Sequence, residues 1–280
     1  MPLTVLETAT WEEVAALKAR DVVVVLPTGS LEQHGPHLPI STDSRLVSEV
    51  ARRAGETVAS RRPGLDILLL PVLMLGRSPH HLDFPGSLSL KTSTYVASIE
   101  EISVCLFRQG FRRLLLLNGH GANTDYLRVA ARNVRDTVEM LVAVAPYWTL
   151  AQRGIAAVRE SPVGGICHAC EMETSLMLHL DEASVRKHKI QDEVPRPISP
   201  RIVLDLLAAD VSVNHNVRDF SESGVLGSPS LATKEKGRLF LDAIVDAVAE
   251  FLIDFARWDL ENLGGGKAAD VKGGNTCRGK

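Results

Sequence analysis

Short blocks of consecutive apolar residues alternate in the first half of the chain with longer stretches whose apolar residues recur every three or four positions. The blocks have the length of buried strands, and the longer stretches have the period of amphipathic helices. The blocks predict strands at 22–26, 67–72, 114–117 and 141–145. The longer stretches predict helices at 10–20, 43–59, 93–109 and 123–138, and two more helices are expected in the less regular second half, at 171–180 and 232–260.

Strands that alternate with helices are typical of an α/β fold built on a parallel sheet. Local signals support the helix ends: Thr10 and Glu13 fit a capping box, and Asn123 is expected to cap the helix that follows it. No internal repeat or domain boundary is visible, so we expect one domain over residues 1–262. Residues 263–280 are rich in glycine and lysine, which predicts a disordered tail.

The strand expected at 22–26 leads into a polar segment that contains Glu32, His34 and Asp43. In an extended segment, residues two apart point the same way. Glu32 and His34 can therefore direct a carboxylate and an imidazole at one point beyond the strand end, and Asp43 can add a second carboxylate. Such a mixed nitrogen and oxygen set is suited to zinc, manganese or iron, so the three residues are candidate metal ligands.

A second histidine lies in the same relation to another predicted strand. His120 follows the strand at 114–117 and stands between Gly119 and Gly121, which allow a close backbone approach. Ligands of parallel sheets bind beyond the carboxyl ends of the strands. We therefore expect His120 to join the first cluster as a metal ligand; the alternative is a turn histidine without a role.

The third cluster contains His168, Glu171 and Glu173. The two glutamates stand at a predicted helix start, where the helix dipole favours carboxylates, so each also has a purely structural interpretation, the stronger one for Glu171. Cys167 and Cys170 have a C-x-x-C spacing that is compatible with redox chemistry or a structural zinc. No second such pair exists, so we expect neither role.

Four further residues have open interpretations. His80 and His81 lie in a proline-containing loop at 76–90 and are expected to be surface or loop residues. His37 either orients the neighbouring ligands or packs beneath their loop. Trp148 either lines the site or belongs to the core.

Composition narrows the class of protein. The chain has 280 residues, 45% of them hydrophobic, and a net charge of −3, so we expect a substantial core and no nucleic-acid partner. The absence of an 18-residue apolar run, of a basic leader and of a cysteine framework predicts a cytoplasmic protein without a membrane span. No P-loop, dinucleotide fingerprint or nucleophile elbow is present.

Taken together, the motifs resemble those of the creatininase family of metal-dependent hydrolases. The resemblance covers roughly residues 5–260 and rests on three motifs in order, with weaker matches at 84–87 and 224–229. The three are Gly-Ser-Leu-Glu-Gln-His-Gly-Pro-His-Leu-Pro at 29–39 with Asp43, Asn-Gly-His-Gly-Ala-Asn at 118–123, and His-Ala-Cys-Glu-Met-Glu-Thr-Ser at 168–175.

The resemblance implies a three-layer α-β-α fold with a mostly parallel central sheet, a small-molecule substrate and a homo-oligomer, often a hexamer. It also implies two divalent metal ions, zinc or manganese or iron(II). Glu32, His34, Asp43 and His120 would be ligands, with Asp43 between the two ions. His168 would be the catalytic proton shuttle.

The chain departs from true creatininases at one position. They carry an acidic ligand two residues after the histidine of Asn-Gly-His, where this chain has Ala122. Glu173 is then the candidate for the fifth ligand, and Glu171 is the next. The departure predicts a substrate other than creatinine; the family also includes formamide deformylases, a peptide-trimming branch and a hydrolase of a cyclic sugar-derived ketone.

The sequence therefore predicts a two-metal hydrolase that cleaves the C–N bond of a small open-chain or cyclic amide with metal-activated water. One alternative is a hydrolase that opens the ring of a cyclic ketone or lactone. Another is a metal-dependent binding protein without turnover. His168 favours an enzyme, because a binding protein has no need of a proton shuttle.

Overall fold

The computed structural model describes residues 3–17, 21–197, 199, 201–208, 211 and 213–258. Its central feature is a five-stranded sheet in which all neighbouring strands are parallel, in the order β1-β3-β2-β4-β5. The strands are β1 (Leu3–Val5), β2 (Asp21–Thr28), β3 (Leu65–Leu69), β4 (Arg113–Asn118) and β5 (Leu141–Pro146). The α/β prediction is confirmed, whereas the tail at 263–280 lies outside the described residues and the single domain stays a prediction.

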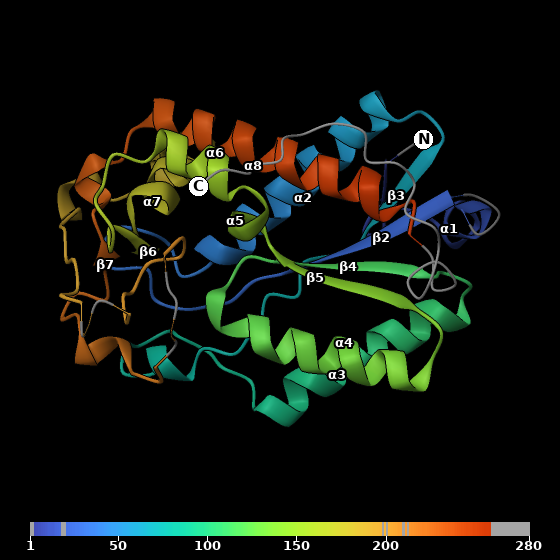
Figure 1. The fold of residues 1–280 in the computed structure, drawn as a ribbon, viewed down its shortest axis with the longest axis horizontal. Coiled ribbons are helices and arrows are strands. Elements are labelled where there is room, and N and C mark those ends of the chain that lie inside the picture. The colour runs from blue at the N-terminus through green and yellow to red at the C-terminus, as the bar shows by residue number, and fades with distance from the viewer. Residues whose placement is uncertain are drawn as a thin grey trace, which may run out of the picture.

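Helices cover both faces of this sheet and make three layers (Figure 1). One face is covered by α2 (Thr42–Arg61), α5 (Tyr147–Leu150), α6 (Gln152–Val158), α7 (Glu171–Leu180) and α8 (Lys234–Phe255). The other face is covered by α3 (Thr92–Arg108) and α4 (Thr124–Thr137), with α1 (Trp11–Leu17) beside them. A short antiparallel pair, β6 (Ile166–His168) and β7 (Leu226–Gly227), stands apart from the main sheet. None of the described helices is long and apolar enough to cross a membrane.

The apolar run of β2 explains its place at the centre of the sheet. Val23 and Val25 pack on the side of α2 and α8, and Val22, Val24 and Leu26 pack on the side of α3 and α4. A strand buried on both faces needs apolar side chains at every position, because successive residues point to opposite faces. The continuous run at 22–26 meets this need.

The sequence of crossovers creates a crevice between β2 and β4. After β2 the chain enters α2 on one face of the sheet, whereas after the neighbouring β4 it enters α4 on the opposite face. The connections therefore diverge at the carboxyl ends of these two strands, which is where open α/β sheets bind ligands.

The predicted elements appear with shifted ends. The strand expected at 67–72 lies at 65–69, the helix expected at 232–260 lies at 234–255, and the short elements β1, α5 and α6 were not predicted. The capping box is present, since Glu13 Oε2 accepts a hydrogen bond from the backbone of Thr10 at 2.7 Å. The prediction for Asn123 is wrong: its side chain does not cap α4 but bonds the backbones of Arg77 and Gly29. Asn123 thereby ties the loop at 76–90 to the end of β2.

Candidate functional site

The first turn of α2 lies directly against the loops that follow β2 and β4. A Cβ atom on Gly29 would lie 2.6 Å from the Cα of Ser44, and a Cβ on Gly119 would lie 3.1 Å from the carbonyl oxygen of Asp43. Only glycine leaves room for the backbones to approach so closely. This contact brings Asp43, at the start of α2, between the two strand-end loops.

The five residues predicted as ligands converge in space. Asp43 Oδ1 lies 2.9 Å from His34 Nε2, and Asp43 Oδ2 lies 3.2 Å from His120 Nδ1. Glu32 Oε1 lies 3.1 Å from the same His120 nitrogen, and Glu173 Oε1, from α7, lies 3.9 Å from His34 Nε2. All five side chains are buried. Five charged or ionisable groups therefore share one water-poor site.

Hydrogen bonds outside the cluster set the orientation of both histidines. His34 Nδ1 donates to the backbone oxygen of Glu32 at 3.1 Å, and His120 Nε2 donates to the backbone oxygen of Arg77 at 3.1 Å. In their neutral forms, both rings then present a lone pair to carboxylate oxygens. Among the described residues, no hydrogen bond of regular geometry reaches Glu32 Oε1, Glu32 Oε2 or Asp43 Oδ2. Because acceptors face acceptors, this donor set fits divalent cations.

The electrostatics of the cluster lead to the same conclusion. Burial disfavours a charged His34 ring, but the Asp43 carboxylate outweighs it and raises the pKa of His34 to about 10. The pKa of His120 is also raised, because Glu32 and Asp43 overcome the effect of burial. Burial raises the pKa of Glu173 to about 7. The site therefore attracts positive charge strongly, and a metal ion would compete for it with protons.

Three groups of described residues have the spacing of metal ligands. One consists entirely of predicted ligands, one combines two predicted ligands with His168, and one combines Glu32 with two other histidines. The groups are Glu32, Asp43 and His120; His34, His168 and Glu173; and Glu32, His81 and His168.

His168 stands beside the predicted ligands. Its Nε2 donates to the backbone oxygen of Gln33 at 2.7 Å, and its Nδ1 lies 3.6 Å from Glu32 Oε1. Its ring centroid is 4.2 Å from that of His34. Burial and a nearby His34 lower the pKa of His168 well below its ordinary value, so the ring is neutral near pH 7.

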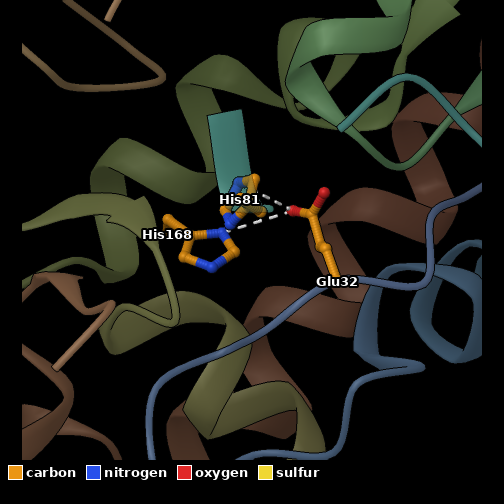
Figure 2. A group of neighbouring side chains, drawn as sticks. All are labelled: Glu32, His81 and His168. Atoms are coloured by element: carbon orange, nitrogen blue, oxygen red, sulfur yellow. Dashed lines mark ion pairs between the residues drawn. The ribbon is translucent and has the colours of Figure 1, made fainter. Parts of the chain in front are cut away.

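His81, predicted to be a surface or loop residue, lies in the loop at 76–90 but not at the surface. The side chain is buried, and its Nε2 lies 3.3 Å from Glu32 Oε1. Figure 2 shows that His81 and His168 both turn a ring nitrogen toward Glu32. A backbone bridge between Leu31 and Leu88 draws the loop over the sheet edge, and no pattern in the sequence encodes this pairing.

Glu171 is the member of the third cluster that turns away from the site. Its carboxylate accepts hydrogen bonds from the backbones of Glu160 at 3.0 Å and Ser161 at 2.9 Å, and from Lys236 Nζ at 2.9 Å. These contacts give Glu171 a structural role. Glu173 is left as the glutamate of α7 that faces the cluster.

The remaining candidates lie around the cluster. His37 Nε2 lies 2.8 Å from Thr174 Oγ1, so His37 packs beneath the ligand loop. Cys167 and Cys170 are free thiols whose pKa values are raised by burial, as expected for cysteines that are not reactive. Trp148 is buried and also contributes to the wall of the cavity described next.

A cavity of about 1080 Å³ opens onto the cluster. Ala122 and Trp148 contribute to its wall, as do Arg77, Tyr126 and His215. A smaller cavity of about 590 Å³ lies beside α2 and contains none of the clustered side chains. The larger cavity is therefore the access route to the site.

Comparisons with known proteins agree with this geometry. The family described as "Creatininase: Creatinine amidohydrolase" matches residues 7–252. A creatinine amidohydrolase from Pseudomonas putida is 31% identical over 253 residues, which are 86% of this chain and 93% of that protein. A mycofactocin precursor peptide peptidase from Mycobacterium tuberculosis (strain CDC 1551 / Oshkosh) is 32% identical over 248 residues, 84% of this chain and 85% of that protein.

Solved structures extend the similarity to three dimensions. A crystal structure of creatinine amidohydrolase, a manganese creatininase and a creatininase variant of the Zn–Zn type each align with a TM-score of 0.76 and 29% identity. Each alignment covers 91% of this chain and 98 or 99% of the other chain. The fold around the cluster is thus one that holds manganese or zinc in other proteins.

Proposed function

This chain belongs to the creatininase family of metal-dependent amidohydrolases, and we propose that it cleaves a C–N bond of an amide with the help of two divalent metal ions. The observation that carries the proposal is the position of Asp43. Its two carboxylate oxygens face histidines that come from different strand-end loops, at 2.9 Å and 3.2 Å. A carboxylate in that position can serve two ions at once.

The ligand sets follow from the same distances. Glu32, Asp43 Oδ2 and His120 Nδ1 would hold one ion, and His34 Nε2, Asp43 Oδ1 and Glu173 would hold the other. Zinc and manganese both accept such carboxylate and imidazole ligands, and both occur in related structures. Ions bound there would supply a water of lowered pKa and would polarise the carbonyl group of the substrate.

The chain itself would move the proton. The hydrogen bond from His168 Nε2 to the backbone of Gln33 leaves Nδ1 as the free nitrogen of that ring. A neutral imidazole can take up a proton at Nδ1 and deliver it to the leaving nitrogen of the amide. The lowered pKa of His168 keeps the ring neutral at neutral pH, with Nδ1 unprotonated.

The cavity supports a substrate larger than a single five-membered ring. Ligand cavities of proteins range from about 300 to 1,000 Å³, and this one, at about 1080 Å³, slightly exceeds that range. A short peptide is the second candidate substrate, supported by the cavity volume and by the peptide peptidase among the relatives. Ring opening of a cyclic ketone or lactone is left as an alternative that no observation on the site favours.

A cytoplasmic homo-oligomer, such as a hexamer, also belongs to the proposal. Leu82 and Leu88, on the loop at 76–90, are 55% and 52% exposed, and Leu75 directly before the loop is also exposed. Apolar side chains grouped in this way are typical of a surface that another subunit covers.

Metal analysis and turnover test the proposal together. Protein loaded with zinc or manganese should contain two ions per chain and should hydrolyse at least one compound in a panel of formamides, short peptides, cyclic amides and cyclic ketones. Asp43→Asn should lose both ions, and Asp246→Asn, an exposed aspartate of α8, serves as the matched control. Full metal occupancy without turnover of any compound would favour a binding protein.

A further inference from the structure

Gln33 is buried in the loop after β2, and its side-chain amide has one defined orientation. Its Oε1 accepts a hydrogen bond from the backbone of Gly35 at 2.8 Å. Its Nε2 lies 3.0 Å from the carbonyl oxygen of Gly224 and 2.9 Å from His81 Nδ1. Because the oxygen is held by an N–H donor, the nitrogen must be the atom that faces Gly224 and His81.

This orientation determines which nitrogen of His81 carries a proton. One hydrogen of the Gln33 amide is donated to the Gly224 carbonyl, and the other meets His81 Nδ1, which must accept it. An imidazole that accepts at Nδ1 is neutral and carries its proton on Nε2. His81 Nε2 lies 3.3 Å from Glu32 Oε1, and a dashed line marks this contact in Figure 2. The N–H group of His81 therefore faces Glu32. A nitrogen that carries a proton has no lone pair for a metal ion.

The backbone of Gln33 acts on His168 in the same way. His168 Nε2 lies 2.7 Å from the Gln33 carbonyl oxygen and donates its proton to it. The Gln33 amide nitrogen also lies 3.1 Å from His168 Nε2, but both nitrogens carry hydrogens, so this contact is not a hydrogen bond. The bare nitrogen of His168 is therefore Nδ1, on the side of Glu32.

We propose that Gln33 is a positioning residue: its amide and its carbonyl group set the tautomers of His81 and His168, and His81 orients Glu32 through an N–H group instead of binding metal. The part that concerns His168 as a proton carrier rests on the proposed function. The assignment of the tautomers does not depend on the proposed function. Of the three groups with the spacing of metal ligands, the one formed by Glu32, His81 and His168 is then not a metal site.

A substitution that changes one atom of Gln33 distinguishes its effect on the tautomer of His81 from its effect on that of His168. In Gln33→Glu, the carboxylate can accept but not donate, so His81 would place its proton on Nδ1 and would turn a lone pair toward Glu32. The backbone carbonyl that holds His168 is unchanged in this variant. We therefore expect His81 to change its tautomer and His168 to keep it.

Nitrogen-15 NMR of histidine-labelled, zinc-loaded full-length protein measures this directly, because protonated and bare ring nitrogens have different shifts. The expected result is a protonated Nε2 in both rings of the wild type, and a protonated Nδ1 in His81 alone in Gln33→Glu. His81→Gln and His168→Gln assign the signals. A wild-type His81 with its proton on Nδ1, or a metal-bound His81, would overturn the proposal whether or not the protein has any hydrolytic activity.

Zinc affinity, measured by competition with a chelator, gives a second test that also needs no substrate. The amide nitrogen of His81→Gln can reach the place of Nε2 and donate toward Glu32, whereas His81→Asn is too short. His81→Asn should weaken zinc binding by about 10- to 100-fold, as is usual for groups that orient ligands, and His81→Gln should restore most of the affinity. Equal losses in both variants would show that the ring itself binds the metal and would reject the proposal.

Discussion

Lys236 Nζ lies 2.9 Å from Oε1 of Glu171 and ties the start of α7 to α8. This ion pair decides between the two glutamates of the third motif. Residues two apart on a helix are rotated by about 200° from each other, so Glu171 and Glu173 must face opposite sides of α7. The glutamate that meets the lysine is turned away from His34, and the other is turned toward it.

We predict that Glu173→Gln loses metal and that Glu171→Gln keeps it. Glu173 would supply a charged ligand, which an amide oxygen replaces poorly. Glu171→Gln should instead lower the free energy of unfolding by about 1–3 kcal/mol, because it weakens a charge-assisted hydrogen bond to Lys236. Metal content by elemental analysis and chemical denaturation measure the two effects. Loss of metal in Glu171→Gln alone would reverse the assignment.

His168→Ala should keep its metal and lower kcat by about 10²–10⁴-fold, the typical contribution of a positioned acid or base. The reason is that His168 Nδ1 is free to carry a proton, whereas its Nε2 is already engaged with the backbone of Gln33. The measurement is kcat on whichever amide the wild type hydrolyses, beside metal analysis of the same sample. Stoichiometric loss of metal would instead make His168 a ligand together with His34 and Glu173.

The stability of the metal-free protein should depend on pH through the same cluster. The pKa of His34 is raised from 6.5 to about 10, so its stabilising contribution is complete below pH 6.5 and is lost as the pH rises toward 10. The pKa of Glu173, raised from 4.5 to about 7, acts in the same direction at lower pH, but the lowered pKa values of His81 and His168 oppose it there. Asp43 acts in the opposite direction, because its pKa is lowered from 3.8 and its contribution is lost only in acid.

Calorimetry in the presence of a chelator should therefore show a melting temperature that falls as the pH rises from about 7 to 10, the range in which the raised pKa values of His34 and His120 act. Zinc should flatten this dependence, because bound metal replaces the protons that the cluster would otherwise lose. The control is Asp43→Asn, in which the carboxylate that holds the His34 proton is gone. A melting temperature of the metal-free wild type that rises across the same range would contradict the electrostatic argument.

The parts of the site that could be predicted from the sequence are those attached to recognisable strands. Glu32, His34 and His120 follow long apolar runs, and the carboxyl ends of parallel strands share one edge of the sheet. Proximity then follows from topology alone. Asp43 could be added because it stands at the start of the helix that the same loop enters.

Other parts depend on contacts between distant segments, which no local pattern records. The choice of Glu173 over Glu171 requires Lys236, which is 65 residues away from Glu171. The burial of His81 requires the bridge between Leu31 and Leu88 that folds its loop over the sheet edge. The strand β1 has only three residues, too few for a period to be visible.

We predict that the protein is a poor creatininase. Ala122 contributes to the cavity wall at the position where creatininases carry an acidic ligand, and its methyl group cannot reach or charge a metal ion. Contacts of this kind change specificity between close analogues by a few kcal/mol. The measurement is kcat/KM for creatinine with zinc- and manganese-loaded protein. A value near or above about 10⁴ M⁻¹s⁻¹, usual for an enzyme on its own substrate, would refute the prediction.

The same reasoning predicts that two substitutions compensate each other. If Glu173 takes the place of the acidic ligand that Ala122 cannot provide, then Ala122→Glu should restore metal to the Glu173→Gln protein. The side chain at 122 has room, because the residue is half-buried and borders the cavity. Ala122→Gln in the same background is the matched control, since it has the length of glutamate without the charge. The informative case is one in which Ala122→Glu alone folds and binds metal normally. If the metal content of the Ala122→Glu, Glu173→Gln double variant then stays low, the two positions do not serve the same ion.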